Sequence, residues 1–141
     1  MKKPVYLCAI VCMVLTLTAC PEELDSYSSP MHWRGFADNE SPTVTMPAEG
    51  GDTTLLCTNY VQFAIVRAEE IAGGSDTVVY EKADSTWDYG HIATRWADAQ
   101  VGNGVLQVKL QPNDSGNDRT FIVRVRTAMI VDDCKFVQKP K

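Results

Sequence analysis

From Thr43 to the C-terminus, apolar and polar residues alternate with a period of two, and β-branched residues are frequent. Such alternation is typical of strands that bury one face, and no convincing period of 3.6 residues follows residue 40. Clusters of Gly, Asn, Asp and Pro separate the alternating runs, as tight turns require. The pattern therefore predicts an all-β domain over residues 42–141.

About seven short strands are expected in this domain, which favours a β-sandwich. We expect them at Thr43–Met46, Thr53–Thr58, within Tyr60–Ile71, and at Asp76–Ala83, Val105–Leu110, Phe121–Arg126 and Cys134–Gln138. The pair Asp132-Asp133 is expected to interrupt the chain before the last of them. Residues 84–103 have no clear period, and we expect a helical turn or a long irregular loop there.

A different pattern occupies the N-terminus. Met1-Lys2-Lys3-Pro4 is short and basic, and Val5–Leu17 is a predominantly apolar run of about 13 residues. A transmembrane helix needs roughly 20 apolar residues, so this run is too short to cross a bilayer. The run also lacks a polar face, which disfavours a buried amphipathic helix. The pattern predicts a signal peptide over residues 1–19.

The apolar run ends in Leu17-Thr18-Ala19-Cys20, which resembles the lipobox of bacterial lipoproteins. The resemblance implies cleavage before Cys20 and attachment of a diacylglyceryl group and an acyl chain, such as palmitate, to that residue. Two or more acyl chains anchor a protein stably. An ordinary secretory cleavage is the alternative. We expect a lipoprotein of the outer membrane, whose partner through the lipid is the membrane itself.

Residues 20–41 are polar and contain Pro and Ser, so we expect a lipidated Cys20 followed by a flexible tether. Glu22, Glu23 and Asp25 resemble the acidic export signal of surface lipoproteins in Bacteroidetes, but a solvated linker has the same composition. The domain is therefore expected to face either the periplasm or the cell surface.

Charge excludes one class of partner. The chain carries 13 basic and 18 acidic side chains, a net charge of −5, and loss of Lys2 and Lys3 with the signal peptide would leave −7. Nucleic acids bind mainly through positive charge, so no nucleic-acid partner is expected.

Two cysteines remain after the signal peptide and the lipidated residue are set aside. Cys57 and Cys134 are candidates for a disulfide, because the compartment is oxidising, and two buried free thiols are the alternative. No metal site or cofactor is expected, since neither His32 nor His91 has a ligand partner at i+3 or i+4.

Nothing in the sequence indicates catalysis. No Gly-x-Ser-x-Gly motif occurs, and the acidic pairs Glu69-Glu70 and Asp132-Asp133 would point to opposite faces of a strand. We interpret these pairs as solvated loop charges and expect no enzyme activity.

Three motifs occur together in the alternating region: Ala48-Glu49-Gly50-Gly51, then Asn113, Gly116 and Arg119 in one turn, and a final strand that ends at Gln138. In this order they resemble the BACON domain of Bacteroidetes over about residues 42–139. The chain departs from that pattern at Phe63, where the family often has Trp, and in a longer segment over residues 66–100. The resemblance implies an immunoglobulin-like sandwich and a glycan-binding role.

Aromatic residues are the candidates for sugar binding, because a flat ring packs on the apolar face of a pyranose. The candidate ligand-binding residues are Trp87, Tyr89, His91 and Trp96, with Trp33, Asp88 and Arg95 as further members of the set. The alternative, which we favour, is that at least two of these rings belong to the core.

We therefore expect a noncatalytic, lipid-tethered module that binds a glycan or another envelope component. A structural accessory subunit or spacer of an outer-membrane complex, with no small ligand, is the alternative.

The turn from Asn113 to Asp118 carries several oxygen ligands, but it lacks the spacing of a calcium loop. We expect a plain turn held by hydrogen bonds from Asn and Asp side chains. Arg119 is expected to bond loop carbonyls or a carboxylate.

Overall fold

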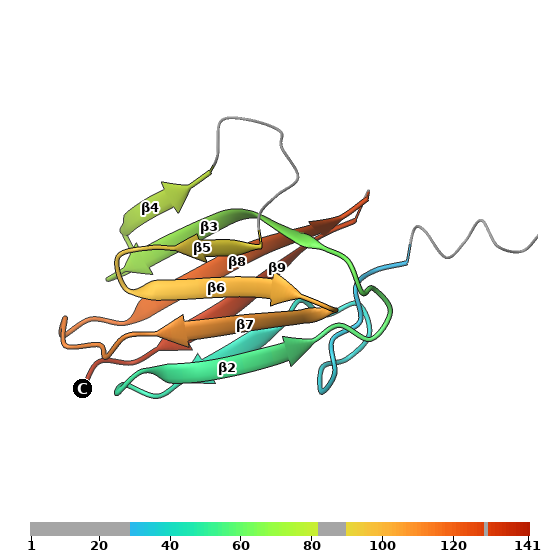
Figure 1. The fold of residues 1–141 in the computed structure, drawn as a ribbon. Coiled ribbons are helices and arrows are strands. Elements are labelled where there is room, and N and C mark those ends of the chain that lie inside the picture. Colours follow the sequence, from blue (N-terminus) through green and yellow to red (C-terminus); the bar gives the residue numbers. More distant parts are fainter. Residues whose placement is uncertain (1–28, 82–89, 129) are drawn as a thin grey trace, which may run out of the picture.

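The computed structural model describes residues 29–81, 90–128 and 130–141. Its strands are β1 (Thr43–Met46), β2 (Gly51–Leu56), β3 (Ala64–Ala72), β4 (Asp76–Tyr80), β5 (His91–Ala93), β6 (Ala97–Gly102), β7 (Val105–Leu110), β8 (Arg119–Thr127) and β9 (Ile130–Gln138). They form a five-stranded sheet of order β1-β9-β8-β3-β4 and a four-stranded sheet of order β2-β7-β6-β5. Figure 1 shows the sheets as two layers, with β2, β7 and β6 in front of β8 and β9. The predicted all-β sandwich is confirmed.

The described residues contain nine strands, where the sequence predicted about seven. The strands at Thr43–Met46 and Val105–Leu110 have the predicted bounds. Two predictions were wrong. Strands β5 and β6 lie in the segment that was expected to be a helical turn or loop. Asp132 and Asp133 do not interrupt the chain but pair with β8 inside β9, so β9 has nine residues.

The core lies between the two sheets. It forms because every second residue along a strand is apolar and points to the same face of its sheet. On β8, Phe121, Val123 and Val125 point inward and are buried, while the residues between them are partly exposed. The Phe121 ring lies 6.4 Å from that of Phe136 and 6.0 Å from that of Trp96, so rings from β8, β9 and the β5–β6 turn meet in the core. Aromatic pairs at such distances stabilise beyond the area they bury.

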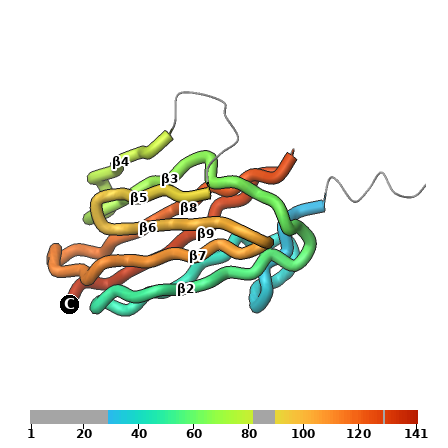
Figure 2. Tube along the Cα trace, viewed as in Figure 1, coloured from blue at the N-terminus to red at the C-terminus, as the bar shows by residue number. Residues whose placement is uncertain are grey.

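The segment before β1 closes one end of the sandwich. Trp33 forms an isolated antiparallel bridge with Cys57, and its Nε1 donates to Asp132 Oδ2 at 2.7 Å. Figure 2 shows this segment at the end opposite the C-terminus. Strand β1 then pairs in parallel with β9. Within the described ranges, no helix has the length and apolarity that a membrane crossing needs.

Two buried amides hold the other end together. Gln138 Nε2 donates to the carbonyls of Pro47 at 2.9 Å and Gln111 at 3.0 Å, which joins the β1–β2 turn to the loop after β7. Asn113 Oδ1 accepts from the Ser115 backbone N–H at 3.3 Å and from the Ser115 hydroxyl at 2.6 Å, so the predicted Asx-type turn is confirmed. Arg119 Nη1 donates to the Pro112 carbonyl at 3.2 Å, as predicted.

Candidate ligand-binding face

The outer surface of the four-stranded sheet is polar. We call this surface the polar face and define it by Asp52, Thr54, His91, Asp98, Gln100, Gln107 and Lys109. Each strand of the sheet alternates: on β7, Leu106, Val108 and Leu110 are buried, whereas Gln107 and Lys109 are exposed. The buried positions fix the register of the sheet, because a slip of one residue would turn the polar side chains inward.

Strand register arranges the polar face in two rows that run across the strands. Thr54 lies opposite Gln107, Gln107 opposite Gln100, and Gln100 opposite His91. In the second row Asp52 lies opposite Lys109, and Lys109 opposite Asp98. Directly opposed residues on one face lie about 5 Å apart, so neighbouring side chains in each row are within reach of one small ligand group.

Most side chains of the polar face are free to bind a ligand. In the described part of the chain, no hydrogen bond or ion pair involves the side chains of Asp52, Thr54, Gln100, Gln107 and Lys109. They border a shallow hollow of about 320 Å³ on the surface of the sheet. The hollow therefore presents amide, hydroxyl, ammonium and carboxylate groups whose hydrogen-bonding capacity is left to solvent or ligand.

One contact on the polar face is formed within the protein. His91 Nε2 lies 2.8 Å from Asp98 Oδ2, joining the edge strand β5 to β6. The two side chains are about half exposed, at 54% and 47%. Exposed pairs of this kind contribute little to stability, so the contact mainly orients the His91 ring on the polar face.

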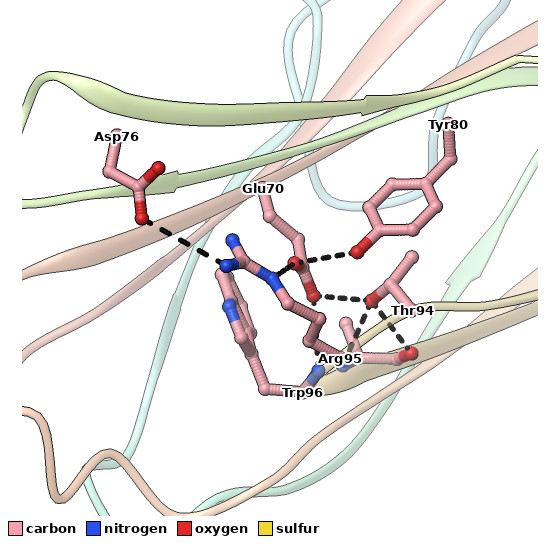
Figure 3. A network of polar contacts seen from close by, with 7 residues as sticks. Glu70, Asp76, Tyr80, Thr94, Arg95 and Trp96 are labelled. Atoms are coloured by element: carbon pink, nitrogen blue, oxygen red, sulfur yellow. Dashed lines mark hydrogen bonds and ion pairs between the residues drawn. The ribbon is translucent and has the colours of Figure 1, made fainter.

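A buried carboxylate beneath the sheet supports the β5–β6 turn. Glu70 of β3 is fully buried and accepts from Thr94 Oγ1 at 2.6 Å, Arg95 Nε at 2.7 Å and the Trp96 backbone N–H at 3.0 Å. Tyr80 Oη donates to the same carboxylate at 3.0 Å. Figure 3 shows these donors converging on Glu70. The network ties the turn of one sheet to an inner strand of the other and so positions β5 and β6.

Opposing effects set the charge state of Glu70. Burial by itself raises the pKa of this carboxyl, but the hydrogen bonds from Thr94, Arg95, Trp96 and Tyr80 outweigh burial and lower the pKa below 4.5. The same contact with Glu70 raises the pKa of Arg95. Glu70 is therefore ionised at neutral pH, and its charge is balanced by donors rather than by water. The prediction that the Glu69-Glu70 pair lies in a solvated loop is wrong, because both residues lie within β3 and Glu70 is fully buried.

The structure separates the predicted sugar-binding residues. His91 lies on the polar face. Trp96 does not offer its ring to a ligand, because it is buried to 6% exposure against Phe121 and the Arg119 guanidinium lies 5.1 Å from its centroid. Trp87 and Tyr89 lie outside the described residues.

The alternative interpretation of the candidate aromatic residues, that at least two of their rings belong to the core, is confirmed. Trp33 and Trp96 are both buried in the core. Trp33 packs edge-on against Phe63, with centroids 5.6 Å apart. Arg95, another member of the set, is engaged by Glu70. In a small sandwich, burial of a large aromatic ring stabilises the fold more than exposure of that ring would.

Cys57 and Cys134 both carry free thiols in this structure, and both are buried. Cys57 Sγ lies 3.3 Å from Asn59 Oδ1. Burial, together with Asp132, Asp133 and Cys57, raises the pKa of the Cys134 thiol well above its usual range. The disulfide that the sequence left open is thus not formed here. The lipidation residue, Cys20, lies outside the described residues.

No cluster of three or more His, Cys, Asp or Glu side chains suited to a metal ion occurs among the described residues. The acidic pair Asp132-Asp133 was also expected in a solvated loop. Instead Asp133 accepts two hydrogen bonds of 2.8 Å from Arg124 on the neighbouring strand. This contact lowers the pKa of Asp133.

Sequence reasoning missed the glutamines and charged residues of the polar face. Their signal is present in Val105–Leu110, where Gln107 and Lys109 alternate with buried residues. The pattern shows that these side chains point outward. It does not show which strands lie beside β7, and therefore which polar residues share its face.

Comparisons with known proteins establish similarity of fold. An NMR structure of a protein from Bacteroides thetaiotaomicron matches with a TM-score of 0.59 at 24% sequence identity, covering 81% of this chain and 90% of that one. No family model matches the chain, and no curated protein matches it.

Proposed function

We propose that this protein is a noncatalytic, lipid-tethered module that binds a neutral glycan on the polar face. The observation that carries the proposal is the set of exposed, unpartnered polar side chains that Asp52, Thr54, Gln100, Gln107 and Lys109 place around one hollow. Sugar hydroxyls both donate and accept hydrogen bonds. Amides, a hydroxyl, an ammonium and a carboxylate side by side match that chemistry.

The charge of the hollow favours a neutral sugar. Lys109 lies between Asp52 and Asp98 in the register, so its positive charge is flanked by two negative ones. Against a chain of net charge −5, this arrangement offers no excess of positive charge to a uronate or a sulfated glycan.

The tether belongs to the same proposal. The lipobox resemblance at Leu17-Thr18-Ala19-Cys20 supports anchoring to the outer membrane, with the sandwich outside the cytoplasm. The chain enters the sandwich at Ser29–Trp33, at one end, so the outer surface of neither sheet is covered by this entry (Figure 2).

The strand order supports an immunoglobulin-like class for the sandwich. The run β9-β8-β3-β4 corresponds to strands G, F, C and C′ of that fold, and β2-β7-β6 corresponds to B, E and D. The parallel pair of β1 and β9 supplies the remaining edge. A BACON-like domain is part of the proposal on the three motifs given above.

A polysaccharide panel tests the proposal. The detergent-purified protein is run in native gels that contain neutral glucans, mannans, xylans or mucin glycans, and a retarded band reports binding. We expect retardation by at least one neutral polysaccharide, and at least tenfold weaker binding for Gln100→Ala/Gln107→Ala. The matched control is Gln62→Ala/Gln111→Ala, which removes two exposed glutamines that lie off the polar face. Absence of retardation across the panel, or equal loss in both variants, would overturn the proposal.

A second candidate function rests on the opposite surface. The outer side of the five-stranded sheet carries Ile71, Ile122 and Val137, all partly exposed, and Val79 at 44% exposure. In the register Glu69 lies between Val79 and Ile122, so the surface mixes apolar and charged side chains, a composition that a protein partner such as an accessory subunit of an outer-membrane complex would fit. Cross-linking on intact cells would recover a stoichiometric partner with the wild-type protein and less of it with Val79→Lys.

A further inference from the structure

The first row of the polar face has one uncharged or weakly basic side chain from each strand. Thr54, Gln107, Gln100 and His91 come from β2, β7, β6 and β5 respectively. Neighbouring strands lie about 4.8 Å apart, so the row extends over about 14 Å in even steps. The second row, Asp52, Lys109 and Asp98, runs beside it at the distance of two residues along a strand, about 7 Å.

This geometry suits a straight chain with a regular step. A pyranose residue in an extended β-1,4-linked chain advances by nearly the same distance as one strand spacing. We propose that the polar face binds a linear β-1,4-linked pyranose chain lying across the strands, with about one sugar residue for each strand from β2 to β5. The inference rests on the proposed function and adds the class and the direction of the ligand.

The alternative direction, along a strand, offers a poorer set of partners. Outward positions of β7 are Val105, Gln107 and Lys109, and those of β6 are Asp98, Gln100 and Gly102. One end of each path is therefore Val or Gly, and neither gives a side-chain hydrogen bond. Across the strands, a chain between the two rows has polar neighbours on both sides at β2, β7 and β6.

The shape of the polar face also favours one type of glycosidic linkage over another. The hollow is shallow and borders residues of β2, β6 and β7 rather than forming an enclosed pocket. An extended β-1,4 chain can keep contact over four strands, whereas an α-1,4-linked chain curves away after a few residues. The face therefore favours cellulose-like or mannan-like chains over starch-like ones.

A length series tests the direction. Calorimetry on the detergent-purified protein uses β-1,4-linked glucose and mannose oligomers of two to six units, with maltohexaose as the linkage control. For at least one β-1,4 series we expect affinity to rise about tenfold or more from two to four units and to change less than twofold beyond. Maltohexaose is expected to bind at least tenfold more weakly than the β-1,4 hexamer.

The two ends of the row give the decisive variant. Thr54→Ala/His91→Ala removes side chains about 14 Å apart. It should weaken the tetramer at least fivefold while changing the dimer, held at Gln107 and Gln100, less than twofold. Thr45→Ala is the matched control, because Thr45 is an exposed threonine on the edge strand β1 of the other sheet.

The outcomes separate the two proposals. Binding without length dependence, or a tetramer unaffected by the end variant, contradicts the direction while leaving a glycan on the face. Equal binding of maltohexaose contradicts the class. If neither these oligomers nor β-1,4-linked xylan binds while another neutral polysaccharide does, the inference fails and the proposed function stands. If no neutral polysaccharide binds at all, both fail.

Discussion

The fully buried carboxylate of Glu70 accepts a hydrogen bond of 2.7 Å from Nε of Arg95, whose own side chain is half exposed. The contact joins strand β3 of one sheet to the β5–β6 turn of the other, and Trp96 follows in the same turn. Since β5 and β6 carry His91, Asp98 and Gln100, the geometry of the polar face depends on this contact between Glu70 and Arg95.

Removal of the Glu70 charge should destabilise the fold. In Glu70→Ala the buried N–H of Trp96 loses its acceptor, and an unsatisfied buried donor costs about 1–3 kcal/mol. We expect the free energy of unfolding in urea to fall by about 2–3 kcal/mol. Asp133→Asn is the control, because its partly exposed pair with Arg124 should contribute less than about 1 kcal/mol. Equal losses in the two variants would contradict the role given to Glu70.

Acid should act through the same residue. The folded-state pKa of Glu70 is lower than its ordinary value of 4.5, so its contribution to stability is present above pH 4.5 and is lost as the pH falls through the folded-state pKa. Thermal melts between pH 7 and pH 3 should show this decline in the wild type. In Glu70→Gln the decline should be shallower, and an unchanged slope would show that other carboxylates dominate.

We expect that replacement of Gly50 destabilises the fold, because the structure leaves no room for a side chain there. Gly50 has a φ of +81°, and an added Cβ would collide with backbone atoms of Leu110, Gln111 and Pro112. Gly51→Ala is the matched control, since Gly51 also has a positive φ of +136° but has open space around it. We expect Gly50→Ala to lose about 3–5 kcal/mol and Gly51→Ala about 1–2 kcal/mol of unfolding free energy. Similar losses would contradict the collision.

Trp96 is predicted to matter for stability rather than for binding. Its ring is buried beside Phe121, so Trp96→Ala should lose about 3–5 kcal/mol. His91→Ala, at an exposed position, should change stability by no more than about 0.5 kcal/mol. Urea denaturation of both variants checks this. A Trp96→Ala protein as stable as the wild type would place the ring outside the core.

We expect the thiols of Cys57 and Cys134 to be protected from alkylation in the folded protein and not to be joined in a disulfide. Because Cys57 and Cys134 are buried, iodoacetamide at pH 8 should label neither in the folded protein. In urea without a reductant, peptide mapping should find both labelled. Peptides that carry label only after reduction would show a disulfide, the other possibility that the sequence left open.

The class of fold could be predicted from the sequence because burial of one face of a strand leaves a visible trace, the alternation of apolar and polar residues. In Val105–Leu110 every second residue is buried, and the predicted bounds are those of β7. Strand β6 lacks such a trace, because its inward residues Ala97 and Ala99 are small and have weak strand propensity. Pairing with β7 overrides that weak preference and fixes β6 as a strand.

The site was less predictable than the fold. The sequence pointed to aromatic residues as the binding site, but Trp96 is buried in the core, where its large apolar ring stabilises the fold. Glu70 gives no sequence signal of burial, since its donors come from Tyr80 and from a turn about 25 residues away. The polar face combines the consecutive strands β5, β6 and β7 with β2, which lies far from them in the sequence, and only the pairing of β2 with β7 brings Thr54 and Gln107 together.

The most direct test of the central proposal, that a β-1,4-linked glycan binds on the polar face, is a two-dimensional NMR titration of the side-chain amides. The ¹⁵N-labelled protein in detergent micelles is titrated with β-1,4-linked glucose and mannose hexasaccharides. We expect the amide signals of Gln100 and Gln107 to shift while those of Gln62 and Gln111, exposed but off the face, stay unchanged. Shifts confined to Gln62 and Gln111, or none at saturating sugar, would contradict the proposal.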